Sequence, residues 1–269
     1  MLYKVKDGQM KKLKEKKVVV IGGSRGTGLA IVEALLDEAA DVLVVGRHTK
    51  SLADLVSAFP KVRTLKADAT DAATAAKVFQ DSPDVVVLAA GAVPPTKPVY
   101  QLDWETFSTN WNADVKASFL LAKYALTAPV KSGTEIIFIS SGAAIGGSPI
   151  SGGYAGSKRT QMFIANYAQE ASNRLKLGLR FIALAPWRLM KDTGTGEVVI
   201  PGYTAYIGIP EKDFIATMTL PQTKEDVAEA VVAFSGHPPA AKEGNVFIVS
   251  EKGVVPESNM QNVLLAGTK

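Results

Sequence analysis

Tyr154 precedes Lys158 by four residues, within a stretch of mostly small residues, SGGYAGSKRTQ at 151–161. If this stretch is helical, the two side chains lie one turn apart on the same face. A phenol can exchange a proton with a substrate oxygen, and a nearby ammonium stabilises the phenolate and lowers the pKa of the phenol from its ordinary value of about 10. The spacing is common by chance, so its meaning depends on what the rest of the chain brings to it.

The elements that must position this pair are predicted from apolar periodicity. Short runs rich in β-branched residues recur at 18–21, 42–45, 62–67, 85–90, 136–140, 181–185 and 246–250. Most are continuously apolar, which is typical of strands covered on both faces, and segments with helical periodicity lie between them. This alternation predicts an α/β fold: a doubly wound, seven-stranded parallel sheet (Rossmann-like) with helices on both faces, in a single domain.

The chain is expected to divide into a basic lead-in over 1–15 and one domain over 16–269. Within that domain, residues 187–222 look irregular, and their length predicts a substrate loop or lid. Apolar runs such as VVVLAAGAV at 85–93 are too short to span a bilayer, so no membrane association is expected. The chain has no cysteine and no apolar leader, which favours a cytoplasmic location, and its two histidines predict no metal site.

A glycine-rich turn follows the first predicted strand in the sequence IGGSRGTGLAIVEALL, with spacing G-x-x-x-G-x-G. Glycines allow a tight turn and a close backbone approach to a pyrophosphate, and the helix that begins there points free N–H groups at the anion. A tight turn without a ligand is the alternative. The residues expected to contact the dinucleotide are Gly22, Ser24, Arg25, Gly26, Thr27 and Gly28.

The end of the second strand indicates which dinucleotide binds. An NAD site usually has an acidic residue here, but this chain has Gly46 and then Arg47. Arg47, helped by Arg25, can hold a 2′-phosphate, so the sequence predicts NADP(H), unless Arg47 is a plain surface arginine. Asp68, followed by Ala69, ends the third strand, where its carboxylate either accepts from the adenine amino group or caps the strand end.

Ser141 lies thirteen residues before Tyr154, at the end of the fifth strand. With the glycine turn, the strand alternation and Lys158 in this order, the chain resembles the short-chain dehydrogenase/reductase family over roughly residues 16–253. The resemblance implies NADPH-dependent, reversible reduction of a ketone or aldehyde to an alcohol. It makes Tyr154 the acid and base, while Lys158 lowers its pKa and holds the nicotinamide ribose. Ser141, rather than Ser140, would position the carbonyl.

The resemblance also implies further site residues. Many members have an asparagine that supports a proton-relay water beside the lysine. Asn112 fits this role, and Asn110 is a less favoured alternative. Asn112 could instead have a structural role at a helix kink or cap. Where the family often has N-N-A-G after the fourth strand, this chain has Leu88-Ala89-Ala90-Gly91. Ala90 and Gly91 are expected beneath the cofactor, with Pro186, Trp187 and Thr193 near the nicotinamide.

Several alternatives remain open from the sequence. A 3-oxoacyl or steroid-type reductase has the same motifs, and a non-catalytic NADP-sensing regulatory protein belongs to a different class, although such proteins typically lose the tyrosine or the lysine. The basic N-terminus offers only weak support for nucleic-acid binding, so none is expected. The helices around 112–128 and 154–176 are those through which the family usually forms a homotetramer, with a dimer as the alternative.

Overall fold

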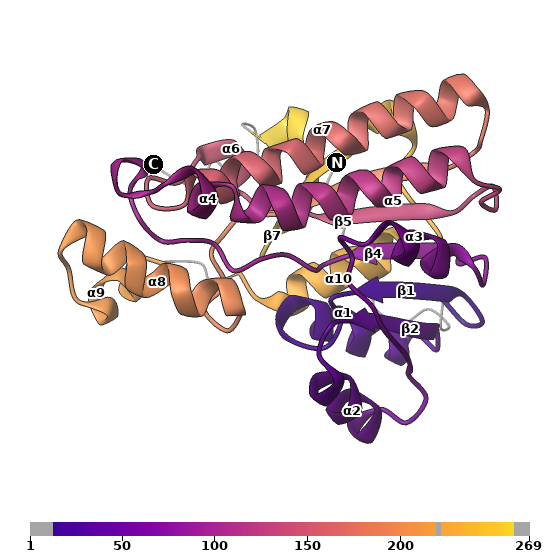
Figure 1. Cartoon of the computed structure of the whole chain (residues 1–269), viewed down its shortest axis with the longest axis horizontal. Coiled ribbons are helices and arrows are strands. Elements are labelled where there is room, and N and C mark those ends of the chain that lie inside the picture. Colours follow the sequence, from indigo (N-terminus) through magenta and orange to yellow (C-terminus); the bar gives the residue numbers. More distant parts are fainter. Residues whose placement is uncertain (1–12, 219–221, 261–269) are drawn as a thin grey trace.

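The computed structural model describes residues 13–218 and 222–260, and these ranges form an α/β fold around one sheet (Figure 1). The sheet has eight strands in the order β3-β2-β1-β4-β5-β6-β7-β8. The strands are β1 (Lys17–Ile21), β2 (Asp41–Gly46), β3 (Arg63–Lys66), β4 (Val85–Leu88), β5 (Glu135–Ile139), β6 (Arg180–Pro186), β7 (Val246–Ser250) and β8 (Gly253–Pro256).

The first seven strands are parallel, as the sequence predicts. The predicted count of seven is one short, because β8 adds an eighth, antiparallel strand to the edge beside β7. Only Glu251 and Lys252 separate β7 from β8. A four-residue strand, GVVP, with a terminal proline gives almost no periodic signal, so it was not predicted from the sequence.

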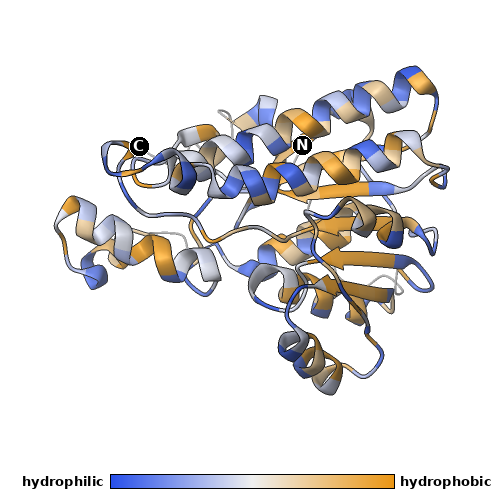
Figure 2. Ribbon diagram, in the orientation of Figure 1, coloured by the Kyte–Doolittle hydropathy of each residue, from blue (hydrophilic) through white to orange (hydrophobic). Residues whose placement is uncertain are grey.

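Helices cover both faces of the sheet, and alternate residues of β1 belong to separate cores. Val18 and Val20 pack with the helices on one face, whereas Val19 and Ile21 pack with those on the other face. Figure 2 shows that the strands between these layers are strongly hydrophobic. The helices are α1 (Gly26–Asp37), α2 (Thr49–Ala58), α3 (Ala72–Phe79), α4 (Trp104–Phe107), α5 (Lys116–Thr127), α6 (Ala143–Gly146), α7 (Gly152–Leu175), α8 (Gly194–Ile207), α9 (Glu211–Ala216) and α10 (Lys224–Phe234).

Side chains cap the starts of α3 and α10. The Asp71 side chain accepts the backbone N–H of Ala73 and so caps α3. Thr223 and Asp226 form a reciprocal capping box at the start of α10. In the described part of the chain, no helix combines the length and the apolar character needed to cross a bilayer.

The segment predicted to be irregular, 187–222, is largely helical where it is described. It contains α8 and α9, which extend beyond the carboxyl ends of the strands (Figure 1). The Thr193 side chain caps α8 by accepting the backbone N–H of Gly196. Three glycines, a proline and several β-branched residues give α8 low helix propensity, so the cap and the tertiary contacts decide its conformation.

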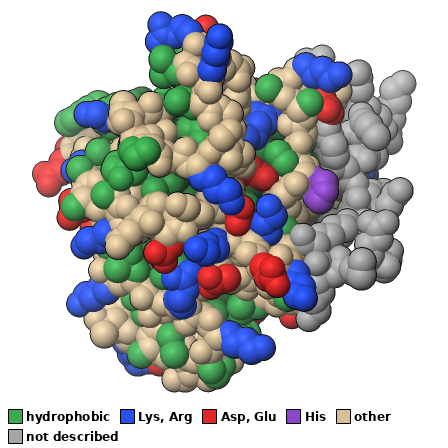
Figure 3. Space-filling model, turned by 90° about the vertical axis from the view of Figure 1, so that its right-hand side faces the viewer, with side chains coloured by type: hydrophobic (Ala, Val, Ile, Leu, Met, Phe, Trp, Pro, Cys, Tyr) green, Lys and Arg blue, Asp and Glu red, His purple; other side chains and the backbone are tan. Residues whose placement is uncertain are grey.

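The predicted lead-in, 1–15, is described only from residue 13. Residues 13–15 form a turn, and Leu13 is fully buried in the core that includes α10. Residues 1–12 lie outside the described part. Charged side chains of both signs mingle at the amino ends of the strands (Figure 3), where Asp84 pairs with Lys16 and Lys131.

A buried carboxyl group lies at the start of β5. Glu135 is only 4% exposed, and its Oε1 accepts the backbone N–H of Gly236 at 2.9 Å. Burial raises the pKa of Glu135 to about 7 from an ordinary value of 4.5. The raised pKa means that the folded state prefers the neutral carboxyl. The stability that the neutral carboxyl contributes, relative to the ionised one, is therefore fully present below the unfolded pKa and is lost as the pH rises through the folded pKa.

Glu135→Gln is therefore expected to change the pH dependence of stability. Near pH 5 the variant and the wild type should unfold at similar urea concentrations. Near pH 8 the variant should be more stable than the wild type by up to about 3 kcal/mol. The ionised carboxylate destabilises the folded state by about 1.4 kcal/mol for each pH unit between its unfolded and folded pKa. Glutamine avoids this cost and can still accept the Gly236 N–H. The exposed Glu33→Gln serves as the control. A difference between variant and wild type that is the same at both pH values would contradict this expectation.

Candidate active site

A cleft of about 530 Å³ lies at the carboxyl ends of the parallel strands, as expected for a doubly wound sheet. It collects residues from distant parts of the chain. The predicted site residues that line it are Gly22, Ser24, Arg25, Gly26, Thr27, Gly28, Arg47, Asp68, Ala69, Ala90, Gly91, Ser141, Tyr154, Lys158, Pro186, Trp187 and Thr193. Asn112 is the predicted site residue that does not line it.

The glycine turn fits closely against the end of β4. A Cβ on Gly22, which has φ +87°, would lie 2.6 Å from the Cα of Ala90. A Cβ on Gly28 would lie 2.1 Å from the carbonyl oxygen of Gly22. Larger residues at either position would push the turn out of place, and α1 would no longer begin at the cleft. The turn therefore suits the close backbone approach that a pyrophosphate requires.

At the end of β2, Arg47 reaches the cleft with a side chain that is 57% exposed, and its Nη1 lies 3.8 Å from Oδ2 of Asp68. The Asp68 Oδ1 accepts both the backbone N–H and the hydroxyl of Thr70, each at 2.8 Å. These bonds, the backbone one foremost, hold the pKa of Asp68 below its ordinary value. Asp68 thus caps the end of β3, and Oδ2 is the oxygen that faces Arg47.

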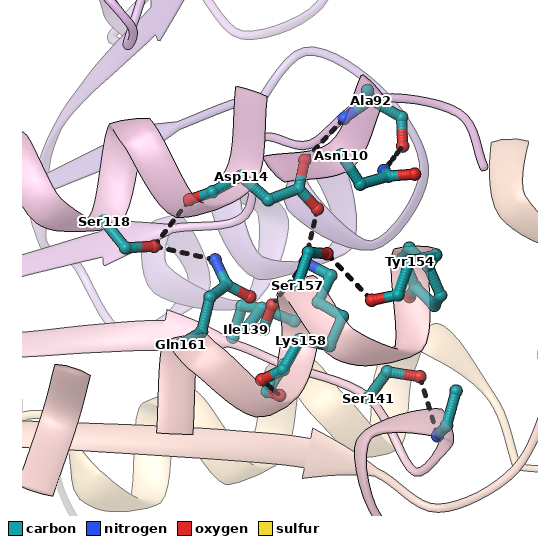
Figure 4. A network of polar contacts seen from close by, with 12 residues as sticks. Ala92, Asn110, Asp114, Ser118, Ile139, Ser141, Tyr154, Ser157, Lys158 and Gln161 are labelled. Carbon is teal, nitrogen blue, oxygen red and sulfur yellow. Dashed lines mark hydrogen bonds and ion pairs between the residues drawn. The ribbon is translucent and has the colours of Figure 1, made fainter. Parts of the chain in front are cut away.

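Tyr154 and Lys158 lie in the first turns of α7, as the four-residue spacing predicts (Figure 4). The Lys158 Nζ lies 5.6 Å from the centroid of the Tyr154 ring and donates to the carbonyl oxygen of Ile139 at 3.0 Å. The lysine is buried, with 6% of its surface exposed. An ammonium held this close to a phenol can stabilise the phenolate.

The two serines after β5 differ in what their hydroxyls contact. The Ser140 hydroxyl is buried and donates to the backbone carbonyl of Lys158 at 2.8 Å, which ties β5 to α7. The Ser141 Oγ accepts the backbone N–H of Ala143 at 3.2 Å, so its own O–H is left to donate into the cleft. The geometry thus favours Ser141 over Ser140 for contact with a substrate oxygen.

The structure does not support the prediction for Asn112. Its side chain is exposed on η2 (Trp111–Val115), a π-helical turn, and its Nδ2 donates to the Ser108 Oγ at 3.4 Å. The alternative, Asn110, is fully buried and donates to the carbonyl oxygen of Ala92 at 2.8 Å, so it holds the segment after β4.

Asp114 lies at the cleft instead of Asn112, and it was not predicted from the sequence. Its Oδ2 is 3.2 Å from the Lys158 Nζ, and its Oδ1 accepts the backbone N–H of Ala92 at 2.8 Å. The missed signal was periodicity: Asp114 shares a helical face with the buried residues Ala117 and Leu121, whereas Asn112 shares one with the exposed Phe119. Residue type alone favoured the asparagine, although helical periodicity places Asp114 on the buried face.

The backbone beyond β6 shapes the other side of the cleft. The Gly142 N–H donates to the carbonyl oxygen of Pro186 at 2.7 Å, and the Trp187 N–H to that of Val249 at 2.9 Å. Thr193 lines the cleft, but its hydroxyl caps α8 and donates to the Met190 carbonyl oxygen. A hydrogen bond from this hydroxyl to the nicotinamide, near which Thr193 is expected, would therefore compete with the cap.

The end of the cleft beside α8 is bounded by three hydroxyl groups, those of Ser148, Ser151 and Tyr203. The Tyr203 hydroxyl on α8 lies 2.9 Å from the Ser148 Oγ, which joins α8 to the segment between α6 and α7. The Ser151 hydroxyl donates in turn to the Ser148 Oγ at 2.7 Å. Over residues 13–218 and 222–260, no group of three or more His, Cys, Asp and Glu side chains is placed to hold a metal ion.

The amino-acid sequence is similar to those of known dehydrogenases. A family model described as short chain dehydrogenase matches residues 16–189. The chain is 29% identical over 192 residues to 2,5-dichloro-2,5-cyclohexadiene-1,4-diol dehydrogenase of Sphingobium indicum, covering 66% of this chain and 74% of that one. It is 27% identical over 157 residues to the NADP-dependent (R)-specific alcohol dehydrogenase of Lentilactobacillus kefiri, covering 55% and 62%.

A solved structure agrees with the fold. The short-chain dehydrogenase/reductase (glucose/ribitol dehydrogenase) of Brucella melitensis has a TM-score of 0.69 with this chain at 21% identity, covering 88% of this chain and 95% of that one. Since the family model spans well over half of the chain, this protein belongs to the short-chain dehydrogenase/reductase family, whose oxidoreductases use nicotinamide cofactors on small-molecule substrates.

Proposed function

We propose that the protein is an NADPH-dependent reductase of ketones or aldehydes that also runs in reverse as an alcohol dehydrogenase. The observation that carries the proposal is the placement of Tyr154, Lys158 and Ser141 around one cleft that begins at the glycine turn. NADPH, when bound, supplies a hydride to the carbonyl carbon. The cradle at Gly22 and Gly28, which a Cβ would fill, fits its pyrophosphate.

The chain's own residues supply the proton chemistry. The Tyr154 hydroxyl donates its proton to the carbonyl oxygen as the alcohol forms, and it takes the proton back in the reverse direction. The Lys158 ammonium stabilises the phenolate and holds the nicotinamide ribose. The Ser141 hydroxyl donates a hydrogen bond to the same carbonyl oxygen and so fixes its position.

The cofactor preference is proposed from the charges at the adenosine end. Arg25 and Arg47 line the cleft there, and no acidic residue follows Gly46 directly to accept from a ribose hydroxyl. Both guanidiniums can donate charge-assisted hydrogen bonds to a 2′-phosphate. The alcohol dehydrogenase of L. kefiri, which is NADP-dependent by name, supports this preference. The substrate end is formed by the segment that includes α8.

A panel of ketones, aldehydes and alcohols, followed by nicotinamide absorbance with each cofactor, tests this function. Turnover of small carbonyl compounds with NADPH supports it. Turnover restricted to acyl thioesters or steroids would favour the 3-oxoacyl or steroid-type reductase instead. Tight NADPH binding without turnover of any compound would favour an NADP-sensing protein.

We also propose a homotetramer, with a dimer as the alternative. Exposed aromatic side chains line α5, α7 and the preceding turns, among them Trp104, Phe119, Phe163 and Tyr167, which are 40–75% exposed. A shallow depression between Trp104, Trp111 and Phe119 could receive side chains of a second copy. Light scattering is expected to give four times the mass of the chain, and Phe163→Lys with Tyr167→Lys should lower it. A monomeric wild type would contradict the proposal.

A further inference from the structure

Asp114 carries a buried carboxylate that the proposed mechanism does not use. Its side chain is fully buried, and that of its partner Lys158 is 7% exposed. Burying a charge is costly unless it is paired and hydrogen-bonded, and here both conditions are met. The Oδ1 accepts the Ala92 N–H at 2.8 Å, and the Oδ2 lies 3.2 Å from the Lys158 Nζ (Figure 4).

Three parts of the chain fix the position of this carboxylate. The Ser118 hydroxyl donates to the Asp114 carbonyl oxygen at 2.8 Å, and the Gln161 Nε2 on α7 donates to the Ser118 Oγ at 2.8 Å. After β4, a Cβ on Gly91 would lie 2.9 Å from the Asp114 Oδ2, so the glycine leaves the room that the carboxylate occupies. The π-helical turn, α7 and the end of β4 therefore hold the Asp114 carboxylate in one position.

The Asp114 carboxylate favours the charged form of Lys158. Burial disfavours the ammonium, but the charge of Asp114, the charge of Tyr154 and the hydrogen bond to Asp114 together outweigh it, so the pKa of Lys158 is raised above its ordinary value. Of the three N–H donors on Nζ, one bonds to the Ile139 carbonyl oxygen, and a second is on the side of the Asp114 Oδ2, with which Nζ forms an ion pair. The third is left for a ligand in the cleft.

The surroundings of the pair contain few other charges. Within the described part of the chain, Tyr154 on α7 is the titratable group that acts on Lys158 besides Asp114. The segments 89–93 and 139–143, which pack against the pair, contain no ionisable side chain. Lys116, near the start of α5, interacts with Asp68 at the adenosine end. The field at the Tyr154 phenol is therefore set mainly by Lys158 and Asp114 together.

The geometry points to Asp114 as a positioning residue that fixes Lys158 and offsets part of its positive charge at the Tyr154 phenol, and so sets the pH range in which the enzyme exchanges protons with its substrate. This inference rests on the proposed function. A nearby negative charge favours the protonated form of every neighbouring group. Without it, the phenol and the ammonium both lose their protons at lower pH.

The test is the pH profile of kcat/KM for alcohol oxidation with NADP+ in Asp114→Asn. Asparagine keeps the size of the side chain, and its Oδ1 can still accept the Ala92 N–H. The rising limb is expected to move to lower pH by about one unit, so that kcat/KM at a given pH on that limb rises about tenfold. The alkaline limb should also move to lower pH. A residue that only supports the fold would change the height of the profile and leave both limbs in place.

The matched control is Asp84→Asn. Asp84 is also a largely buried carboxylate paired with lysines, 3.5 Å from the Lys16 Nζ and 2.7 Å from the Lys131 Nζ, but it precedes β4 at the opposite end of the sheet from the cleft. Its variant is expected to keep the wild-type profile. A displacement of equal size in Asp84→Asn would show that the effect belongs to net charge and would overturn the inference.

A second measurement is independent of turnover. Carbon-13 at Cζ of tyrosine reports ionisation of the phenol by NMR, and the Tyr154 signal is assigned as the one lost in Tyr154→Phe. The midpoint should move to lower pH by about one unit in Asp114→Asn, or in Asp114→Ser if the asparagine variant does not fold. An unmoved midpoint in a folded variant overturns the inference. If the wild type turns over no substrate, the proposed function fails, while this titration still decides the role of Asp114.

Discussion

Tyr154→Phe is expected to lower kcat/KM for carbonyl reduction by about 1,000-fold while the affinity for NADPH changes little. The substitution removes the Tyr154 hydroxyl, which is the proton donor to the substrate oxygen, and general acid catalysis contributes on the order of 100- to 10,000-fold. The ring remains against the Lys158 ammonium, whose contact at 5.6 Å is with the ring itself. The loss should therefore lie in kcat rather than in cofactor binding.

Steady-state kinetics and NADPH fluorescence titration measure the two quantities separately. Tyr124→Phe is the matched control, because Tyr124 stacks on Phe79 at a centroid distance of 5.6 Å and lies outside the cleft. It should retain full activity. A Tyr154→Phe enzyme within tenfold of the wild type would remove Tyr154 from the mechanism.

Arg47→Leu is expected to weaken NADPH binding by about 10- to 150-fold and to leave NADH binding nearly unchanged. A hydrogen bond to a charged group is worth about 1.5–3 kcal/mol, which converts to that range of affinity. Since the 2′-phosphate is what distinguishes the two cofactors, losing the guanidinium removes the preference and not the site. The Asp68 carboxylate, 3.8 Å from Arg47, would then repel the phosphate without an intervening cation.

Fluorescence titration of wild type and variant with each cofactor gives the four dissociation constants that this prediction needs. Lys50→Leu is the control, because Lys50 is an exposed cation three residues further along, and it pairs with Asp54 at 2.7 Å. It should change neither constant. Equal losses for NADPH and NADH in Arg47→Leu would mean that the arginine supports the fold of the adenosine end and does not select the cofactor.

Much of the architecture could be predicted from the sequence because its signals are local. Continuous apolar runs such as 18–21 and 85–90 predicted the parallel strands, and the glycine spacing predicted the turn that begins α1. The pair Tyr154 and Lys158 could be placed on one face because the periodicity of a helix is fixed. The cap at Asp71 depends on a single residue type in front of a helical segment, which is also a local feature.

The features that were missed depend on contacts between distant segments. α8 has weak helix propensity and is joined to Ser148 by the Tyr203 hydroxyl, a partner 55 residues away. Asp114 meets Lys158 across 44 residues, where η2 and α5 pack against α7. β8 is a short edge strand specified by its pairing with β7. Helical periodicity places Asp114 on a buried face, but no local pattern encodes which distant residue it meets.

The central claim is that hydride and proton reach one carbonyl group in this cleft, with Tyr154 as the proton donor. NADPH that carries deuterium at the transferable position of its ring tests it most directly, with a carbonyl substrate selected from the panel and mass spectrometry of the alcohol product. We expect deuterium on the carbinol carbon with the wild-type enzyme and almost none in the same time with Tyr154→Phe. Alcohol formed without deuterium, or labelled equally by both proteins, would contradict the claim.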